Sequence, residues 1–201
     1  MPQQQSHERP RIGCYHEAGH CLARWYFGRQ SDWGVVLTRA GGRQDATIEN
    51  CHASMQAETL ASVEVALAEL YAGSAAEARH RRMSFIAVAV TGSGEDHSRG
   101  EKLLDVWFPK PAARKATALL AERRALALVR STVGWAAITT MAKHLQAHGE
   151  LSWDKGNVFC EKTFGWSWSS RRYASQSDLP SVEDIRCGLK PRAPLRRRMA
   201  N

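Results

Sequence analysis

The chain of 201 residues has few cysteines and no long apolar run. Its five cysteines are an odd number and include no CxxC pair, which argues against a disulfide framework or a thiolate zinc knuckle. No apolar run approaches the roughly 18 to 20 residues of a membrane span, and the polar start MPQQQSHERP lacks a signal-peptide core. We therefore expect a soluble, cytoplasmic protein with no transmembrane segment.

Composition predicts one packed domain with a basic end. Apolar residues make up 43% and charged residues 24% of the chain, close to the averages for globular proteins. Of the net charge of +8, residues 171–201 contribute +5, through eight Lys/Arg against three Asp/Glu. We expect a flexible N-terminus over residues 1–9, one domain over 10–166 and a basic, mobile tail over 167–201, where nucleic acid would bind if it binds at all.

Periodicity and punctuation predict a mainly α (α+β) fold. Pro10 is typical of a first helical residue and Gly28 of a residue just past a helix end, so a helix is expected between them. Two β-prone runs flank Gly41-Gly42 and predict a small hairpin. Further helical patterns cover residues 54–82, 94–108, 111–148 and 153–165; the third is long enough to be two antiparallel helices with a break near 131–134.

The first predicted helix contains the motif His16-Glu17-Ala18-Gly19-His20, an HExxH sequence. Four residues are slightly more than one helical turn, so both imidazoles project from one face and can bind one metal ion. Glu17 lies beside them, where it can accept a proton from water as a general base. The motif therefore predicts a Zn²⁺ site.

A catalytic zinc site needs a third protein ligand, which the motif does not supply. The extension HExxHxxGxxH is absent, because Ala23 and Tyr26 occupy the positions of its Gly and His. A more distant ligand is required. The candidates are His52, Glu77, His80, Asp96 and His97.

Three segments in order resemble the proteolytic domain of the FtsH-type, ATP-dependent zinc metalloproteases. CYHEAGHCL is similar to the family's YHEAGHA helix, ELYAGSAAEA to its GGRAAEE segment, and TGSGEDHSRGEKLL to its TGAxNDLxxAT segment. The likeness is weaker over residues 113–160. The resemblance implies a helical zinc-peptidase domain with the HExxH helix, a small β element and a C-terminal helical hairpin.

The same resemblance implies roles for individual residues. Asp96 would be the third zinc ligand, after His16 and His20, and Glu77 would lie beside the ligands without being one of them. His97 replaces an aliphatic residue of the family and is an alternative ligand, although we expect it to face solvent. The chain has no GxxxxGK[ST] nucleotide-binding loop, so it resembles the peptidase domain alone.

These observations predict a zinc-dependent metalloendopeptidase that hydrolyses peptides or unfolded chains without ATP, with Glu17 as its catalytic base. A separate ATPase or adaptor would be its partner for folded substrates. The alternative is a catalytically silent domain of the same fold that binds a peptide or an ATPase, although such a domain has no use for Glu17. A third hypothesis, nucleic-acid binding through the basic end, predicts a steep salt dependence.

Overall fold

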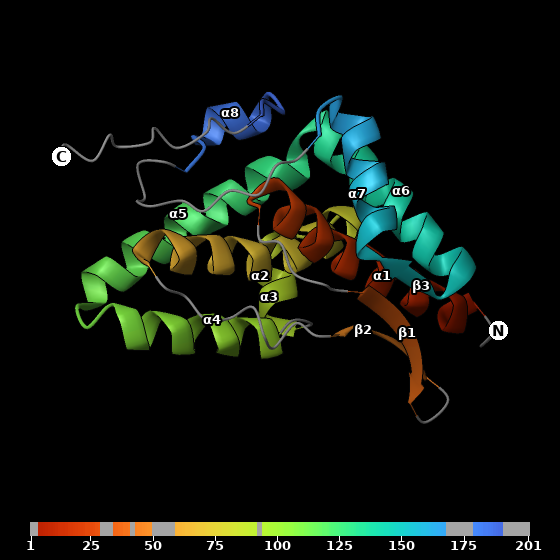
Figure 1. Ribbon diagram of the computed structural model, residues 1–201. Coiled ribbons are helices and arrows are strands. Elements are labelled where there is room, and N and C mark those ends of the chain that lie inside the picture. Colours follow the sequence, from red (N-terminus) through yellow and green to blue (C-terminus); the bar gives the residue numbers. More distant parts are fainter. Residues whose placement is uncertain are drawn as a thin grey trace.

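A computed structural model describes residues 4–28, 34–40, 43–49, 59–91, 94–167 and 179–190 of the chain. These residues form a mainly helical structure with one small sheet (Figure 1). The elements in chain order are α1 (Gln4–Tyr26), β1 (Gly34–Ala40), β2 (Arg43–Glu49), α2 (Leu60–Arg81), α3 (Phe85–Thr91), α4 (Gly94–Trp107), α5 (Pro111–Arg130), α6 (Thr132–His148), β3 (Glu150–Ser152), α7 (Trp153–Phe164) and α8 (Val182–Arg186).

Helix α2 is the centre of the core. It begins at a capping box, in which the Thr59 hydroxyl accepts from the Ser62 amide at 3.1 Å and the Ser62 hydroxyl accepts from the Thr59 amide at 2.9 Å. Every residue from Val63 to Ala78 is buried, so α2 is covered on all sides rather than along one stripe. It therefore contacts α1, α3, α4 and α5.

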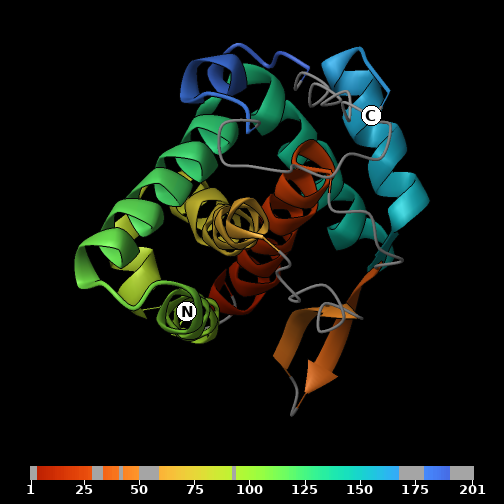
Figure 2. The same ribbon diagram turned by 60° about the vertical axis from the view of Figure 1, so that its left-hand side comes forward.

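Helices α1 and α2 pack with their backbones close together, and Figure 2 shows α1 crossing the middle of the molecule beside α2. A Cβ added at Gly19 would lie 2.4 Å from the Ala72 carbonyl oxygen and 2.8 Å from the Ala76 Cβ. Small residues on both helices are therefore necessary at this crossing. The run of small residues Ala72–Ala76 makes that contact with α1.

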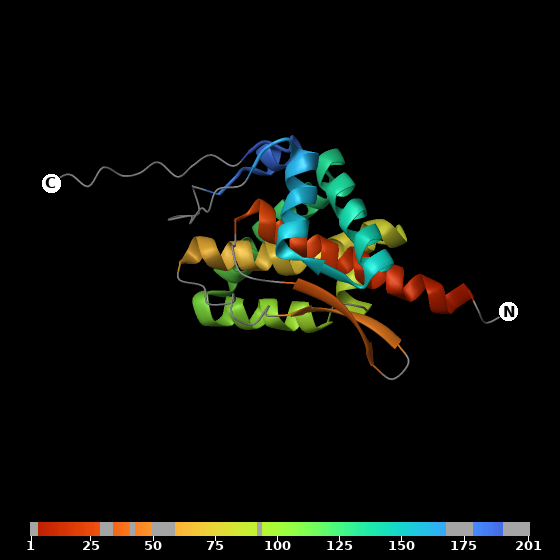
Figure 3. The same cartoon turned by 45° about the vertical axis from the view of Figure 1, so that its right-hand side comes forward.

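The sheet has the strand order β2-β1-β3, and both pairings are antiparallel. β1 and β2 are the two β-prone segments of the sequence, joined as a hairpin in which Val35 pairs with Ile48. β3 adds to the other side of β1 over Gly34–Val36 only. The hairpin projects from the helical body, below α1 in Figure 3.

Several boundaries differ from the expectations. α1 begins at Gln4 instead of Pro10, so residues 4–9 are helical. A proline inside a helix removes one amide donor, but the helix can continue through it. α2 begins at Leu60, where Thr59 supplies the cap, and the short helices α3 and α8 were not expected. Helices of seven and five residues contain too few turns to show a clear period.

The expected antiparallel hairpin of α5 and α6 is wrong in its angle, although its break is at Ser131 as predicted. The two helices bend by 75° at that residue. Ser131 caps α6, accepting from the Gly134 amide at 2.9 Å, and one connecting residue is too short for the loop of about two to five residues that an antiparallel pair uses. No single described helix is long and apolar enough to cross a membrane; the bent α5–α6 pair reaches that threshold only when both are combined.

Part of the expected mobile tail is folded. Within residues 167–201, the segment 179–190 includes α8, which packs against α5 and buries Ile185 completely. The Tyr26 hydroxyl donates to the Leu189 carbonyl at 2.7 Å, and the Arg124 Nε donates to the Pro180 carbonyl at 3.0 Å. The remaining residues of that range beyond 167 lie outside the described part of the chain.

Candidate metal centre

His16 and His20 lie on the face of α1 that contacts α2, one helical turn apart. Their rings meet edge to face, with 4.7 Å between the centroids and 3.0 Å between the two Nε2 atoms. The remaining ring nitrogens point away from each other: His16 Nδ1 lies 3.3 Å from Glu77 Oε2, and His20 Nδ1 lies 2.8 Å from the Glu69 carbonyl oxygen. Both of these partners belong to α2.

The partners of the Nδ1 atoms determine which nitrogen of each neutral ring carries the proton. A carbonyl oxygen and an ionised carboxylate only accept hydrogen bonds, so both Nδ1 atoms must donate. The neutral rings therefore present bare Nε2 lone pairs to each other. Two lone pairs 3.0 Å apart repel unless a proton or a metal ion lies between them.

Asp96, in the first turn of α4, supplies the third group. Its Oδ2 lies 3.0 Å from His16 Nε2 and 3.2 Å from His20 Nε2, so the three atoms form a nearly equilateral triangle. Tetrahedral zinc with bonds of 2.0 to 2.1 Å holds its ligand atoms about 3.3 Å apart. These three metal-binding atoms therefore fit a single metal ion, and His16, His20 and Asp96 can hold one. We call the three atoms, His16 Nε2, His20 Nε2 and Asp96 Oδ2, the donor triangle.

Without a metal, protons take its place. Burial lowers the pKa of His16, but hydrogen bonds to Asp96 and Glu77 outweigh it and raise that pKa to about 10. Burial also lowers the pKa of His20, and the Asp96 charge raises it to a net value above normal. Burial raises the pKa of Asp96, yet the charged His20 and the imidazole hydrogen bonds hold it well below its usual range. Metal binding must displace these protons.

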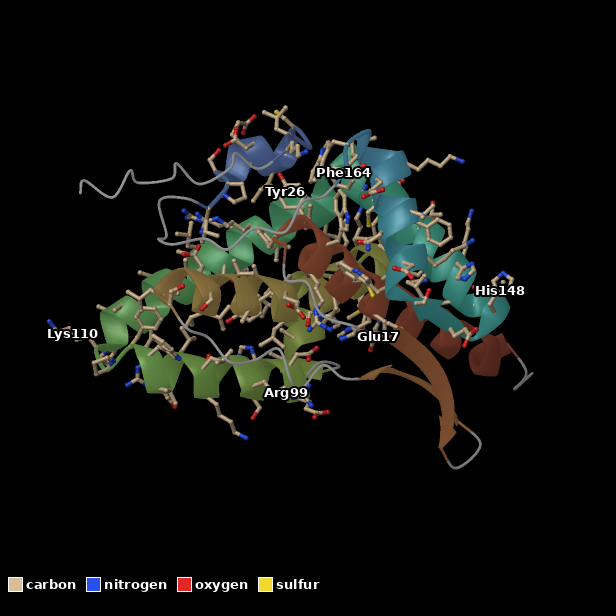
Figure 4. All side chains as sticks on the ribbon, viewed as in Figure 1. Glu17, Tyr26, Arg99, Lys110, His148 and Phe164 are labelled. Atoms are coloured by element: carbon tan, nitrogen blue, oxygen red, sulfur yellow. The ribbon has the colours of Figure 1, made fainter. Side chains whose placement is uncertain are left out.

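Glu17 follows His16 on α1 and is 9% exposed. Burial raises the pKa of its carboxyl group, while the charges of His20 and His16 lower it. Arg99 on α4 acts on Glu17 in the same direction as the histidines, and Figure 4 labels both side chains. A buried carboxyl group with a raised pKa next to the donor triangle has the protonation behaviour of a general base or acid.

Three residues of α2, Glu77, Arg81 and Gly73, shape the surroundings of the His16 imidazole. Glu77 accepts from His16 Nδ1 through Oε2 and from Arg81 Nη1 through Oε1, at 2.7 Å for the second bond. These two hydrogen bonds outweigh burial and lower the pKa of Glu77, which keeps its carboxylate ionised. Gly73 leaves room for the rings, because a Cβ there would lie 2.3 Å from His20 Nε2 and 2.9 Å from His16 Nε2.

The other ligand candidates lie elsewhere. The His97 side chain is 52% exposed, its Nε2 lies 4.0 Å from Glu101 Oε1, and it is not one of the three residues of the donor triangle. His80 stacks on Tyr15 with 3.9 Å between ring centroids. His52 lies outside the described residues. Cys14 is buried, which raises the pKa of its thiol to about 11, and it is not one of the three residues of the donor triangle.

Glu69 contacts His20, and Arg24 contacts Glu69; neither was among the candidates from the sequence. The Glu69 carbonyl accepts from His20, and its carboxylate accepts from Arg24 Nε at 2.8 Å. A signal for them exists in the sequence: Arg24 lies four residues after His20, on the same helix face, and would be buried with it. A charge on a buried face requires a partner, but the sequence does not identify that partner.

No model of a protein family matches the chain, and a search of curated proteins gave no match.

Proposed function

We propose that this chain is a zinc metallopeptidase in which His16, His20 and Asp96 hold Zn²⁺ and Glu17 is the catalytic base. The observation that carries the proposal is the triangle of two bare Nε2 atoms and one carboxylate oxygen, with sides of 3.0, 3.0 and 3.2 Å. Three protein ligands leave a fourth position for water, as catalytic zinc sites require.

When bound, the zinc ion would lower the pKa of a water molecule to about 7 and polarise the carbonyl group of the substrate. Glu17 would accept a proton from the attacking water molecule as general base, and would return that proton to the leaving amine when the C–N bond breaks. Glu77 and the Glu69 carbonyl keep the two imidazoles in the tautomer that presents Nε2.

The position of Glu17 favours zinc and hydrolysis over other chemistry. Two histidines and a carboxylate also suit Fe²⁺ in oxygenases. A buried carboxyl group next to the ligands is the base that hydrolysis requires, and a purely structural metal has no need of one. Metal analysis of the purified protein should therefore find about one zinc per chain.

The substrate class follows from how a peptide must reach such a site. A scissile peptide binds in an extended form and pairs with the edge of a sheet. Among the described residues β1 is paired on both sides over Gly34–Val36, whereas β2, β3 and residues 37–40 of β1 have a neighbouring strand on one side only. We propose peptides and unfolded chains as substrates, with folded proteins requiring a separate unfolding partner.

Replacing Glu17 by Gln tests the proposal, because the change removes the base and leaves all three ligands in place. The variant should bind zinc like the wild type and lose at least about 100-fold in the cleavage rate of unstructured peptides. Zinc content and peptide products, followed by mass spectrometry, measure the two effects. Glu101→Gln, at a 54% exposed position of α4, is the matched control and should cleave normally.

Equal behaviour of the wild type and Glu17→Gln toward a broad panel of unstructured chains would contradict the peptidase proposal. Zinc binding without any cleavage by the wild type would instead favour a silent domain that binds a peptide or an ATPase. A pull-down with unfolded chains, using the zinc-loaded protein, separates that case from a purely structural metal.

A further inference from the structure

Arg24 and Glu69 form an ion pair inside the molecule, with side chains 2% and 5% exposed. Both Arg24 Nε, at 2.8 Å, and Arg24 Nη2, at 2.5 Å, donate to Glu69 Oε1. Arg24 is on α1 and Glu69 on α2, so the pair joins the helix that carries both histidines to the helix that contacts their Nδ1 atoms. A buried ion pair is poor evidence of stability, because desolvation offsets most of the attraction. Its presence at this place needs another reason.

The same glutamate also contacts the metal ligand one helical turn earlier on α1. The main-chain carbonyl of Glu69 accepts from His20 Nδ1 at 2.8 Å, while its side chain binds Arg24. One residue of α2 thus contacts two successive turns of α1. Two contacts of this kind restrict both the sliding and the rotation of one helix on the other.

The register of α1 on α2 matters because the site leaves almost no room for a displacement of α2 against the His20 ring. The face of Gly73 that a Cβ would occupy lies 2.3 Å from His20 Nε2, so a small shift of α2 brings its backbone against the ring. A shift in the opposite direction breaks the bond to the Glu69 carbonyl and frees the imidazole to rotate. The donor triangle then loses His20 Nε2.

We propose that Arg24 and Glu69 are positioning residues for the metal centre, which hold α2 so that the Glu69 carbonyl orients His20. This inference rests on the proposed metal site. On this inference the role of the ion pair is to set metal affinity and coordination geometry rather than folding stability.

The test replaces the pair by apolar residues of similar volume in Arg24→Met/Glu69→Leu, which leaves the net charge unchanged. Buried pairs replaced in this way often cost no stability. Co²⁺ is the probe, since its visible absorption reports coordination geometry. In the full chain the double variant should bind Co²⁺ about 10- to 100-fold more weakly and with an altered spectrum. The melting temperature of the metal-free protein should change little.

The chain supplies a matched control in a second buried pair. Glu64 of α2 binds Arg124 of α5, with side chains 1% and 8% exposed, and neither of these two helices carries one of the three ligands. Arg124→Met/Glu64→Leu should therefore keep the Co²⁺ affinity and spectrum of the wild type, whatever it does to the melting temperature.

If the double variant does not fold, Arg24→Gln is the milder change and should still weaken and distort Co²⁺ binding. Wild-type affinity and spectrum in a folded Arg24→Met/Glu69→Leu or Arg24→Gln protein would overturn the inference. Equal losses in the Arg124→Met/Glu64→Leu control would overturn it too, since they would show a general effect of buried charge. Failure of the metal site itself is recognised separately, by Co²⁺ binding to the wild type that His16→Ala leaves unchanged.

Discussion

At the metal centre, protons compete with a metal ion for the nitrogen atoms of the two imidazoles. His16 donates through Nδ1 to Glu77 and faces Asp96 with Nε2, so an added proton on Nε2 is held by a carboxylate 3.0 Å away. The same geometry that would bind zinc therefore binds a proton firmly. Metal affinity and protein stability should both depend on pH for this reason.

The metal-free protein should lose stability as the pH rises from 6.5. The pKa of His16 is 6.5 in its ordinary state and about 10 in the folded protein. Below pH 6.5 both the folded and the unfolded chain carry the proton, and the folded form gains the full interaction with Asp96 and Glu77. Above 6.5 the unfolded chain releases its proton first, so this contribution shrinks until the pH reaches about 10.

Thermal melts in a chelator at pH 6.5 and 8.5 measure this effect, with a decrease of several degrees expected at the higher pH. His16→Gln is the control and should show a smaller decrease. Zinc affinity should change in the opposite direction and rise about tenfold per pH unit for each proton released. A metal-free protein that melts at the same temperature at both pH values would contradict the assignment.

Asp96 and His97 are adjacent in sequence but should respond differently to substitution. Asp96→Ala removes one corner of the donor triangle and should abolish most zinc binding, whereas His97→Ala removes an exposed side chain and should keep it. Metal content after gel filtration compares the two. The reverse result would show that His97 rotates into the site and that Asp96 is not the ligand.

At the residue scale the sequence predicted part of the site. The HExxH spacing alone places His16 and His20 on one helix face, because helical geometry is local. Asp96 lies 80 residues from His16, and the residues alone left it as one of five candidates. Only the family resemblance favoured it, and the structure brings its carboxylate to both imidazoles. The partners of the Nδ1 atoms depend equally on contacts between helices.

At the scale of elements, the close crossing of α1 and α2 shapes the site. α2 presents small residues where α1 presents Gly19 and the two histidines. Helix propensity alone would favour Ala over Gly at Gly73 by about 1 kcal/mol. The space taken by the imidazoles explains why glycine is needed there.

Gly73→Ala should therefore disrupt metal binding even though alanine is the better helix former. The added Cβ would meet His20 Cε1 at 2.4 Å and Nε2 at 2.3 Å, and these atoms must move out of the donor triangle. We expect a loss in zinc affinity of at least about 100-fold with helix content retained, measured by competition with a chelator and by circular dichroism. Gly94→Ala, at a helical glycine with no atom within 4 Å of its added Cβ, is the control and should bind zinc normally. Normal zinc binding by Gly73→Ala would contradict this account.

Some elements could be predicted from the sequence, whereas the angle between α5 and α6 could not. α4, the α5–α6 break and α7 follow local signals: acidic residues in a first turn, the Ser131 cap, and the Ser152 cap with Gly165 at the end. The 75° angle between α5 and α6 has no such signal. It depends on which surfaces the two helices cover, and α5 packs on α2 while α6 packs on α1.

At the scale of the whole molecule, residues 179–190 close one end of the core. Ile185 is completely buried and Leu179 is 7% exposed. Trp166 stacks on Trp25 with 4.5 Å between ring centroids and donates from Nε1 to the Gly188 carbonyl. The segment thus connects the end of α1 to the end of α7.

Deleting residues 179–201 should lower the stability of the protein. The loss of two buried aliphatic side chains alone corresponds to about 3 to 5 kcal/mol, which is about 10 °C in melting temperature for a protein of this size. Ile185→Ala should reproduce much of the loss, by about 2 to 4 kcal/mol, and Arg186→Ala, at a 64% exposed side chain, should have little effect. An unchanged melting temperature after truncation would show that the segment adds nothing to the core.

The sequence by itself determined what short-range geometry controls: a helical protein, a small hairpin, and two histidines and a glutamate on one helical turn. The tertiary structure decided how α1 lies on α2, that α5 and α6 bend rather than fold back, and that residues 179–190 belong to the core. It also decided that a carboxylate of α4 faces both imidazoles while a carbonyl and a carboxylate of α2 hold them. These are contacts between distant residues, and their energy comes from burial and shape fit across many side chains, which no local pattern records.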